Sequence, residues 1–322
     1  MRVGIIGGGI AGLSAAYELT KQGHFAEVFE SAPFLGGQAS TFDVHGGQLE
    51  RGYHHLFISD THITALIHEL GLGDKLEWLV SSVGFYHGGK IWDFSSPKDL
   101  LRFKPIPFLD RIRVGLWTFI LQRTKSYKRF EGVTAQTWLT KHMGKRGYEV
   151  IWEPLLRGKF GEFYDKIGMT WIWNKVTLRV ASRKGAAQVE RLGYPMGSFG
   201  QVIDVLADRI AQHGGRLHTS SSVTQIVKSG GKSTTLDVEI NGGTSVRREY
   251  DAVIATTPSY VFTKIAPPMP DDYVAKLEGI DYLSAVLMVL VMDRPFTEKY
   301  WMNIADSDMP FVALIEHTNM IE

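Results

Sequence analysis

The chain has no cysteine among its 322 residues. A disulfide framework, a thiolate metal site and a redox-active thiol are therefore excluded, and any redox chemistry must come from a bound group. An excess of charge of one sign is also missing, because 35 Lys and Arg stand against 34 Asp and Glu for a formal net charge of +1. We therefore expect no general attraction to nucleic acid.

Long apolar runs are scarce as well. Residues 109–122 form the most apolar helical pattern, but they include Arg111 and Arg113, and their VGLWTFIL core is too short to span a bilayer. This pattern indicates a buried helix, and the alternative is an apolar substrate tunnel or a membrane-surface patch. The apolar start of the chain is broken by the glycines at 7–9, unlike a secretory signal, so we expect a cytoplasmic protein of roughly two domains.

Glycine, by contrast, is abundant near the start of the chain. An apolar run over 3–6 predicts a buried strand, and Gly7, Gly9 and Gly12 follow it at G-x-G-x-x-G spacing. The first glycine permits a tight turn, the second lets the backbone approach a diphosphate, and the third allows helix and strand to pack closely. This stretch predicts the first half of a dinucleotide-binding β-α-β unit.

A helix over 10–22 and a strand over 26–30 complete the unit. The first helical amides, including those of Ile10 and Ala11, are expected to face the anion. Glu30 ends the second strand, where its carboxylate can accept hydrogen bonds from the 2′- and 3′-hydroxyls of an adenosine ribose. We therefore predict a bound dinucleotide whose adenosine lacks a 2′-phosphate.

The next segment departs from a nicotinamide-binding pattern. Residues 31–56 contain glycine pairs at Gly36-Gly37 and Gly46-Gly47 but no second β-α repeat. A nicotinamide-binding domain would continue into alternating strands and helices. A glycine-rich passage that follows a longer cofactor favours FAD over NAD.

Together these residues resemble the FAD-containing amine oxidase superfamily, which includes protoporphyrinogen oxidases and phytoene-desaturase-like enzymes. The family pattern of a Rossmann unit ending in Glu, a Gly-Gly pair and an acidic-x-Gly stretch matches Glu30, Gly36-Gly37 and residues 50–52. The resemblance implies FAD as the cofactor. It also implies an α/β fold with a Rossmann-like FAD/NAD(P)-binding domain of the glutathione reductase type, discontinuous in sequence, with an inserted mixed α+β substrate domain.

The resemblance also implies specific cofactor contacts. Gly36, Gly37 and Gln38 should line the diphosphate and ribityl region of FAD. Further along the chain, Val223 should contact adenine through its backbone, and the Thr256-Thr257-Pro258 segment should lie beside the ADP. The positions expected near the isoalloxazine ring are Gly52, Tyr53, His54 and His55, of which the two histidines are weak catalytic candidates or hydrogen-bonding spacers.

The implied domains are FAD-binding residues 1–56 and 193–265, a substrate domain at 57–192, and substrate-domain strands at 266–322. A continuous apolar strand is expected over 283–292, and a small antiparallel meander with strands at 217–227, 236–240 and 244–250 should precede a buried strand at 251–256.

Three departures from the family pattern are visible. Gln38 stands where the family has Arg or Lys, and Leu287 stands where amine-oxidising members carry a lysine, which favours desaturase-like or protoporphyrinogen-oxidase-like chemistry. After Pro310 the closing Gly-Asp segment of the family is not recognisable, so we expect a truncated chain that holds FAD loosely or not at all.

The expected function is therefore hydride removal from a C–H or C–N bond of an organic substrate that is large and apolar. Arg157 and Lys159 stand among aromatic residues and are candidate substrate contacts, although the interpretation that we favour is an aromatic core with snorkelling charges. The main alternative is a flavin-dependent sugar isomerase like UDP-galactopyranose mutase. A non-catalytic dinucleotide-binding protein and an NAD-dependent dehydrogenase remain open, and no metal site is expected.

Overall fold

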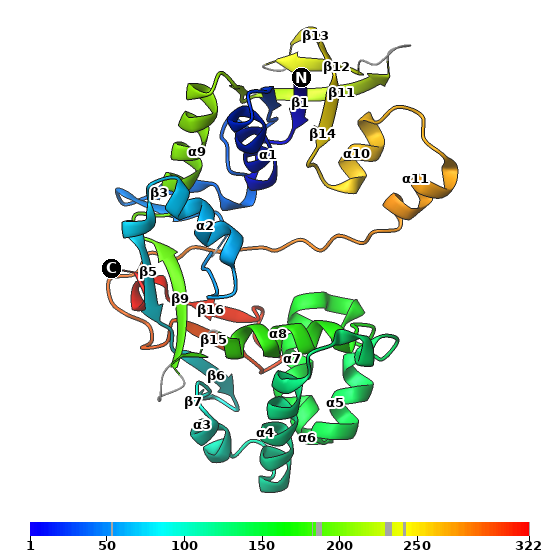
Figure 1. Ribbon diagram of the computed structural model, residues 1–322. Helices are drawn as coiled ribbons and strands as arrows, with labels where there is room; N and C mark the ends of the chain where they lie inside the picture. The colour runs from blue at the N-terminus through cyan, green and yellow to red at the C-terminus, as the bar shows by residue number, and fades with distance from the viewer. Residues whose placement is uncertain (53, 182, 185–188, 229–233, 241–242, 322) are drawn as a thin grey trace. The chain divides into compact units, whose positions relative to one another are not determined.

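The computed structural model describes residues 1–52, 54–181, 183–184, 189–228, 234–240 and 243–321 (Figure 1). These residues divide into two compact units. Unit 1 contains Met1–His54, Ile63–Leu76 and Tyr194–Leu287, and unit 2 contains His55–His62, Glu77–Gly193 and Met288–Glu322.

Unit 1 is built on a parallel sheet with strand order β10-β2-β1-β14. β1 (Arg2–Ile6) pairs with β2 (Phe25–Phe29) on one side and with β14 (Ala252–Ala255) on the other, and β10 (Arg216–His218) pairs with β2. The central strand is buried, as its apolar run predicts. Because β14 comes from a distant part of the sequence, the sheet is discontinuous along the chain, as predicted.

Two helices lie against this sheet. α1 (Ile10–Lys21) buries Leu13, Ala16 and Tyr17, the face that helical spacing predicts, and packs against β2. α9 (Gly200–Gln212) packs against α1 and β10, with Ile203, Leu206 and Ile210 buried. The packing of α1 against β2 and α9 therefore fixes the position of its first turn, which lies at the carboxyl end of β1.

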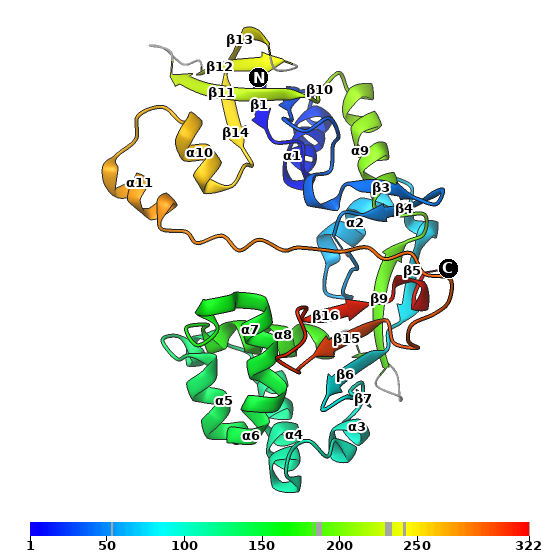
Figure 2. The same cartoon turned by 180° about the vertical axis from the view of Figure 1, so that it is seen from behind.

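An antiparallel meander covers part of unit 1 (Figures 1 and 2). It consists of β11 (Ser221–Lys228), β12 (Thr234–Ile240) and β13 (Thr244–Tyr250). The prediction of one strand over 217–227 was wrong, because two strands occupy this stretch. Ser220, at φ 48°, breaks the extended backbone, so the chain leaves the parallel sheet after β10 and enters the meander as β11.

The meander packs through its apolar side chains onto the parallel sheet. Ile6 and Phe29 of the sheet share a core with residues of the meander and the following helix. The other buried members are Val223, Ile226, Leu236, Val238, Tyr250 and Ile265. The other helices and strands that lie wholly or mostly in unit 1 are β3 (Thr41–Val44), β4 (Gly47–Glu50), α2 (Thr61–Glu69), α10 (Ser259–Ile265) and α11 (Asp271–Glu278).

Unit 2 contains a sheet with the order β16-β15-β6-β7. Gly88 and Gly89 form the turn of a hairpin in which β6 (Val83–His87) is antiparallel to β7 (Lys90–Asp93). β15 (Trp301–Ile304) lies parallel to β6, and β16 (Ala313–Ile315) pairs with β15.

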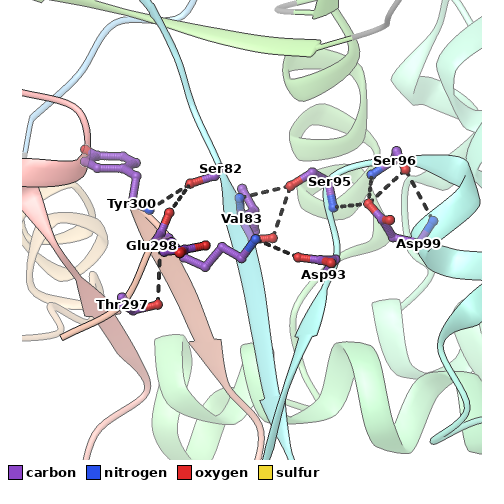
Figure 3. A network of polar contacts seen from close by, with 10 residues as sticks. Ser82, Val83, Asp93, Ser95, Ser96, Asp99, Thr297, Glu298 and Tyr300 are labelled. Atoms are coloured by element: carbon purple, nitrogen blue, oxygen red, sulfur yellow. Dashed lines mark hydrogen bonds and ion pairs between the residues drawn. The ribbon is translucent and has the colours of Figure 1, made fainter. Parts of the chain in front are cut away.

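Polar contacts tie the edges of this sheet together (Figure 3). The amide of Val83 donates to Ser95 Oγ at 3.0 Å, and the Ser95 hydroxyl donates back to the Val83 carbonyl at 3.1 Å. Lys299 pairs with Asp93 at 2.6 Å, and the amide of Tyr300 donates to Ser82 Oγ at 3.0 Å. These contacts join the late segment before β15 to the first hairpin of unit 2.

The remaining strands form a sheet in the order β5-β9-β8, with β5 (Leu76–Val80), β8 (Arg183–Lys184) and β9 (Val189–Pro195). The helices of unit 2 pack around an aromatic-rich core. They are α3 (Pro97–Arg102), α4 (Phe108–Arg123), α5 (Ala135–Met143), α6 (Lys145–Gly147), a π-helix (Tyr148–Trp152), α7 (Glu153–Phe160) and α8 (Met169–Ala181).

The continuous apolar strand predicted over 283–292 was wrong. This stretch is assigned to neither a strand nor a helix, and its apolar side chains are exposed, Val286 at 97% and Met288 at 82%. Apolar composition favours a strand where a sheet edge offers backbone partners, and the pairings of the described residues give this segment none.

Among all the residues that the structure describes, no helix combines the length and the apolar composition needed to cross a membrane.

Candidate functional site

The glycine turn after β1 has the backbone geometry that its spacing predicts. Gly7 has φ +107°, a conformation that favours glycine, and its amide donates to the carbonyl of Phe29 at 2.9 Å. A Cβ atom on Gly12 would overlap the carbonyl oxygen of Gly7, so helix and turn pack more closely than any larger residue allows. Thr256 fixes the same turn by donating its hydroxyl to the carbonyl of Ile6 at 2.9 Å.

Gly9 differs from these two glycines. It caps α1 with φ −73°, which any residue can adopt, and a Cβ atom there would meet nothing nearer than the Gly37 Cα at 3.9 Å. The amides of Ile10, Ala11 and Gly12 follow in the first turn of α1, where an α-helix offers them no intrahelical acceptor. The helix dipole adds positive potential at this end.

The Gly36-Gly37 pair lies directly against the glycine loop at residues 7–9. The amide of Gly36 donates to the carbonyl of Gly8 at 2.8 Å, and Gly36 forms a β-bridge with Gly9. A Cβ atom on Gly37 would lie 3.1 Å from the Gly9 Cα. Gln38 is exposed in the short helical turn that follows. The structure therefore brings the glycines at 7–9 and the Gly36-Gly37 pair together, although they are separated in the sequence. These small residues form a cradle of backbone atoms.

Glu30 stands beside this cradle. Its carboxylate accepts hydrogen bonds from the amide of Gly8 at 2.7 Å and from the amide of Ala32 at 2.8 Å, and Ser31 donates to it at 3.2 Å. Each carboxylate oxygen has two acceptor sites, so capacity for ligand hydroxyls remains. Backbone bonds fix the residue, since its amide donates to the His218 carbonyl and its carbonyl accepts from Ser221, both at 2.8 Å.

The late segments predicted for the site also reach this edge. Val223 lies two residues after Ser221, with its side chain buried in the core under the meander. Thr256 follows β14 directly and is bonded to the glycine turn, and Pro258 caps α10. Within the part of the chain that the structure describes, the buried hydroxyl of Thr257 has no hydrogen-bond partner. A buried hydroxyl of this kind is costly unless a ligand or water completes it.

The residues expected near the isoalloxazine ring fall in different places. His54 is bonded through Nδ1 to the carbonyl oxygen of Gly52 at 2.5 Å, and its ring lies 5.8 Å from that of Phe199. This local bond matches the hydrogen-bonding spacer that we gave as the alternative to a catalytic role. Tyr53 lies outside the described residues, and His55 belongs to unit 2, where its Nδ1 lies 3.1 Å from the Tyr300 hydroxyl.

Arg157 and Lys159 both lie on α7 in unit 2 but have different surroundings. Arg157 bonds to Glu153 at 2.8 Å and to the Tyr164 hydroxyl at 2.6 Å, which commits its guanidinium to neighbours on the same unit. Burial, together with the charges of Lys175 and Arg179, lowers the pKa of Lys159. The lowered pKa disfavours the charged form of Lys159, whose Nζ lies 5.9 Å from the centroid of the Trp171 ring.

Sequence reasoning missed contributions from two residues. Gly8 was passed over as a variable position of the motif, yet its amide is the donor to Glu30, and a Cβ atom there would lie 2.8 Å from the Glu30 Cβ. The run of three glycines was the available signal. For Glu50, which was identified from the sequence only as the acid of the family pattern at 50–52, the contacts were missed: it is buried and accepts bonds from the Tyr194 hydroxyl at 2.9 Å and the Phe199 amide at 2.8 Å. Glu50 thereby joins the end of β4 to the residue that caps α9.

Comparison with known proteins gives the class to which this fold and cradle belong. The model of the flavin containing amine oxidoreductase family matches residues 10–312. The chain belongs to this family, which confirms both the predicted superfamily and the flavin as its cofactor.

Individual relatives agree with this assignment. A 15-cis-phytoene desaturase of Glycine max is 24% identical over 300 residues, covering 88% of this chain and 50% of the relative. The mitochondrial protoporphyrinogen oxidase of Nicotiana tabacum is 26% identical over 172 residues, covering 52% of this chain and 34% of the relative. The chain therefore spans only half of the first of these two relatives and about a third of the second.

Solved structures confirm the fold. The structure of an oxidoreductase from Methanosarcina mazei covers 86% of this chain, which in turn covers 64% of that protein. The TM-score is 0.63 at 19% sequence identity. The predicted α/β fold with a Rossmann-like cofactor domain is therefore correct.

Proposed function

We propose that this protein is an FAD-dependent oxidoreductase that oxidises a C–H or C–N bond of an organic substrate by removing a hydride from carbon. The observation that carries the proposal is the open backbone at Gly9, which stands between the first turn of α1 and the Gly36-Gly37 pair. The cradle fits a diphosphate, because its glycines place no side chain in it. The unsatisfied hydroxyl of Thr257 offers the ligand a further donor.

In this proposal the chain binds and orients the cofactor. The amides of Ile10, Ala11 and Gly12 hold the diphosphate, and Gly36 and Gly37 let it approach the second loop. Glu30 accepts bonds from the ribose hydroxyls while keeping its bonds to Gly8 and Ala32. FAD, when bound, supplies the hydride acceptor, so a side-chain acid or base is not required for that step.

The other predicted cofactor contacts are supported by different observations. The bond from the Ser221 amide to the Glu30 carbonyl supports an adenine contact at Val223 two residues further on, and Gln38 supplies a neutral side chain where the family has a cation. His54 keeps its Nδ1 on the Gly52 carbonyl, so it positions the loop rather than moving a proton at that atom. The assignment of unit 1 to the cofactor and of unit 2 to the substrate is part of the proposal.

The substrate that we propose is large and apolar. The names of relatives, a phytoene desaturase and a protoporphyrinogen oxidase, support this size and polarity. The absence of lysine at Leu287 supports oxidation of carbon rather than of amines. A cytoplasmic location remains a prediction from the sequence. The sugar-isomerase alternative needs a cation for a nucleotide diphosphate, and Arg157 is already bonded to Glu153 and Tyr164.

The test is anaerobic reduction of the reconstituted flavin. The chain is mixed with FAD, freed of excess cofactor and titrated in separate samples with a polyene, a porphyrinogen and a polyamine while visible absorption is recorded. We expect a polyene or a porphyrinogen to bleach the flavin. Tight NADH binding by a chain that takes up no FAD would contradict the proposal, and so would a bound flavin that none of the three donors reduces.

A further inference from the structure

Helix α4, which Figures 1 and 2 show among the helices of unit 2, has apolar side chains on two sides. Towards α5 and α8 it buries Val114 and Leu121, and Trp117 contacts Trp138 with ring centroids 5.4 Å apart. On another side five large apolar residues are exposed, which we call the α4 stripe. They are Phe108 (60%), Leu109 (71%), Ile112 (45%), Leu116 (54%) and Phe119 (50%).

The α4 stripe is one continuous face. Positions 108, 112, 116 and 119 recur at the spacing of successive helical turns, so their side chains line up along the helix. Leu101 at the end of α3, itself 46% exposed, lies close by, since Arg111 of α4 donates to its carbonyl at 2.8 Å. Contiguous exposed apolar surface of this kind marks an interaction site.

The charge around the stripe is strongly one-sided. Residues 97–129 contain nine Lys or Arg and two Asp, in a chain whose net charge is +1. Both acids are engaged locally, Asp110 with Arg113 at 3.4 Å and Asp99 with the amide of Ser96 at 2.8 Å. The excess of positive charge therefore remains available to an anionic partner.

A hollow of about 430 Å³ lies at the end of the stripe. Its lining includes Phe119, Arg123, Lys125, Ser126 and Arg129. The Arg123 guanidinium lies 3.5 Å from the centroid of the Phe119 ring, so a cation stands directly on the apolar face. Among the described residues, Arg123, Lys125 and Arg129 form no ion pair. Three cations beside exposed apolar side chains suit a phosphate that carries an apolar tail.

We propose that the α4 stripe docks this protein on a membrane surface that contains anionic phospholipid, with a lipid phosphate in the hollow. Exposed Phe and Leu beside Lys and Arg have the composition of helices that lie in the membrane interface. Long cationic side chains keep their charge at headgroup level while their stems cover apolar surface. A protein partner that fits this surface would instead have to present an apolar groove of its own with an acidic rim. This docking surface is independent of the proposed redox chemistry.

Vesicle flotation of the full chain tests the proposal. The vesicles are phosphatidylcholine alone or an equimolar mixture with phosphatidylglycerol. We expect binding to the mixed vesicles that weakens with added salt. K125Q/R129Q should lower the partition coefficient by about 20- to 30-fold, from about 1 kcal/mol per cation near an anionic surface. L109S/L116S should lower it at least about tenfold, because both side chains lose apolar contact.

Matched controls lie in unit 1. K228Q/K264Q removes two exposed lysines and Y273S/V286S removes two exposed apolar side chains, and both should bind like the parent chain. Thermal unfolding of every variant should match the parent. Equal binding to both vesicle types, equal losses in the controls, or binding of inorganic phosphate by a chain that ignores vesicles would overturn the proposal. Self-association that L109S/L116S abolishes, in a chain that does not float, would also overturn it.

Discussion

At the residue scale, the three motif glycines have distinct physical roles. Gly7 needs its positive φ, Gly12 has no room for a Cβ atom, and Gly9 has room but stands where a ligand would come. A substitution at Gly12 therefore disturbs the fold, whereas one at Gly9 disturbs only binding. Spacing alone predicted all three, because each role is set by local backbone geometry.

The role of Glu30 could be predicted only in part from the sequence. Its place at the end of a strand indicated a ribose contact, but its bonds to Gly8 and Ala32 depend on how the turn folds back. The carboxylate therefore holds the loop and is available to the ligand at the same time.

Replacing Glu30 with Gln weakens both functions, by different amounts. The amide side chain keeps an acceptor for the Gly8 amide but sets its NH2 group against the amide of Ala32, so the free energy of unfolding should fall by about 1 kcal/mol. Hydrogen bonds to a charged group contribute about 1.5–3 kcal/mol, so the Kd for FAD should rise by about tenfold to a hundredfold. Titration by flavin fluorescence measures this, with Glu278→Gln, an exposed site on α11, as the control. An unchanged Kd would remove Glu30 from the site.

At the scale of elements, the sequence predicted those that carry their own periodicity. The bounds of α1, β13 and the β6–β7 hairpin follow from apolar spacing and turn glycines. The merged strand over 217–227 failed because apolar alternation continues through a turn at Ser220. The π-helix at Tyr148–Trp152 also escaped prediction, since its hydrogen-bond register leaves little trace in composition.

The π-helix gives a pH-dependent prediction. Burial, with the charge of Glu153 as a smaller cause, raises the pKa of Tyr148 to about 12. In the unfolded chain this tyrosine loses its proton near pH 10, while the folded chain keeps it, so the free energy of unfolding should fall as pH rises from about 10 to about 12.

The variant Tyr148→Phe should lose this part of the pH dependence. The Tyr148 hydroxyl is buried and, in the described part of the chain, lacks a hydrogen-bond partner, so its removal should leave stability at neutral pH equal or raise it by about 1 kcal/mol. Denaturant unfolding at several pH values measures both effects. Tyr127→Phe, at a site 49% exposed, is the matched control. A parallel loss of stability above pH 10 in Tyr148→Phe and the parent would refute the assignment.

At the scale of the whole molecule, the discontinuous cofactor domain was predicted from the family resemblance. Periodicity identifies β1 and β14 as buried strands, but it carries no information on which strands become neighbours. The apolar segment 283–292 shows the same limit, because its composition indicates a strand while pairing depends on the rest of the chain.

Limited proteolysis tests the state of this segment, in which the chain passes from unit 1 to unit 2. Chymotrypsin cleaves after Tyr, Leu and Met, which are frequent here, and an unpaired exposed backbone is readily cut. We expect early cleavage between residues 280 and 292, read by intact mass as two fragments. Resistance of this segment while other loops are cut would show that it forms the strand that its sequence predicts.

The most direct test of the central claim is FAD titration of the parent chain and of Gly9→Ala. The backbone at Gly9 accepts alanine, and the added methyl group meets no near neighbour, so the two chains should unfold at the same temperature. Gly243→Ala, a turn glycine with open surroundings, is the control. We predict that Gly9→Ala binds FAD at least about tenfold more weakly, because its methyl group occupies the place of the diphosphate. Equal FAD affinity in the three proteins would contradict the account.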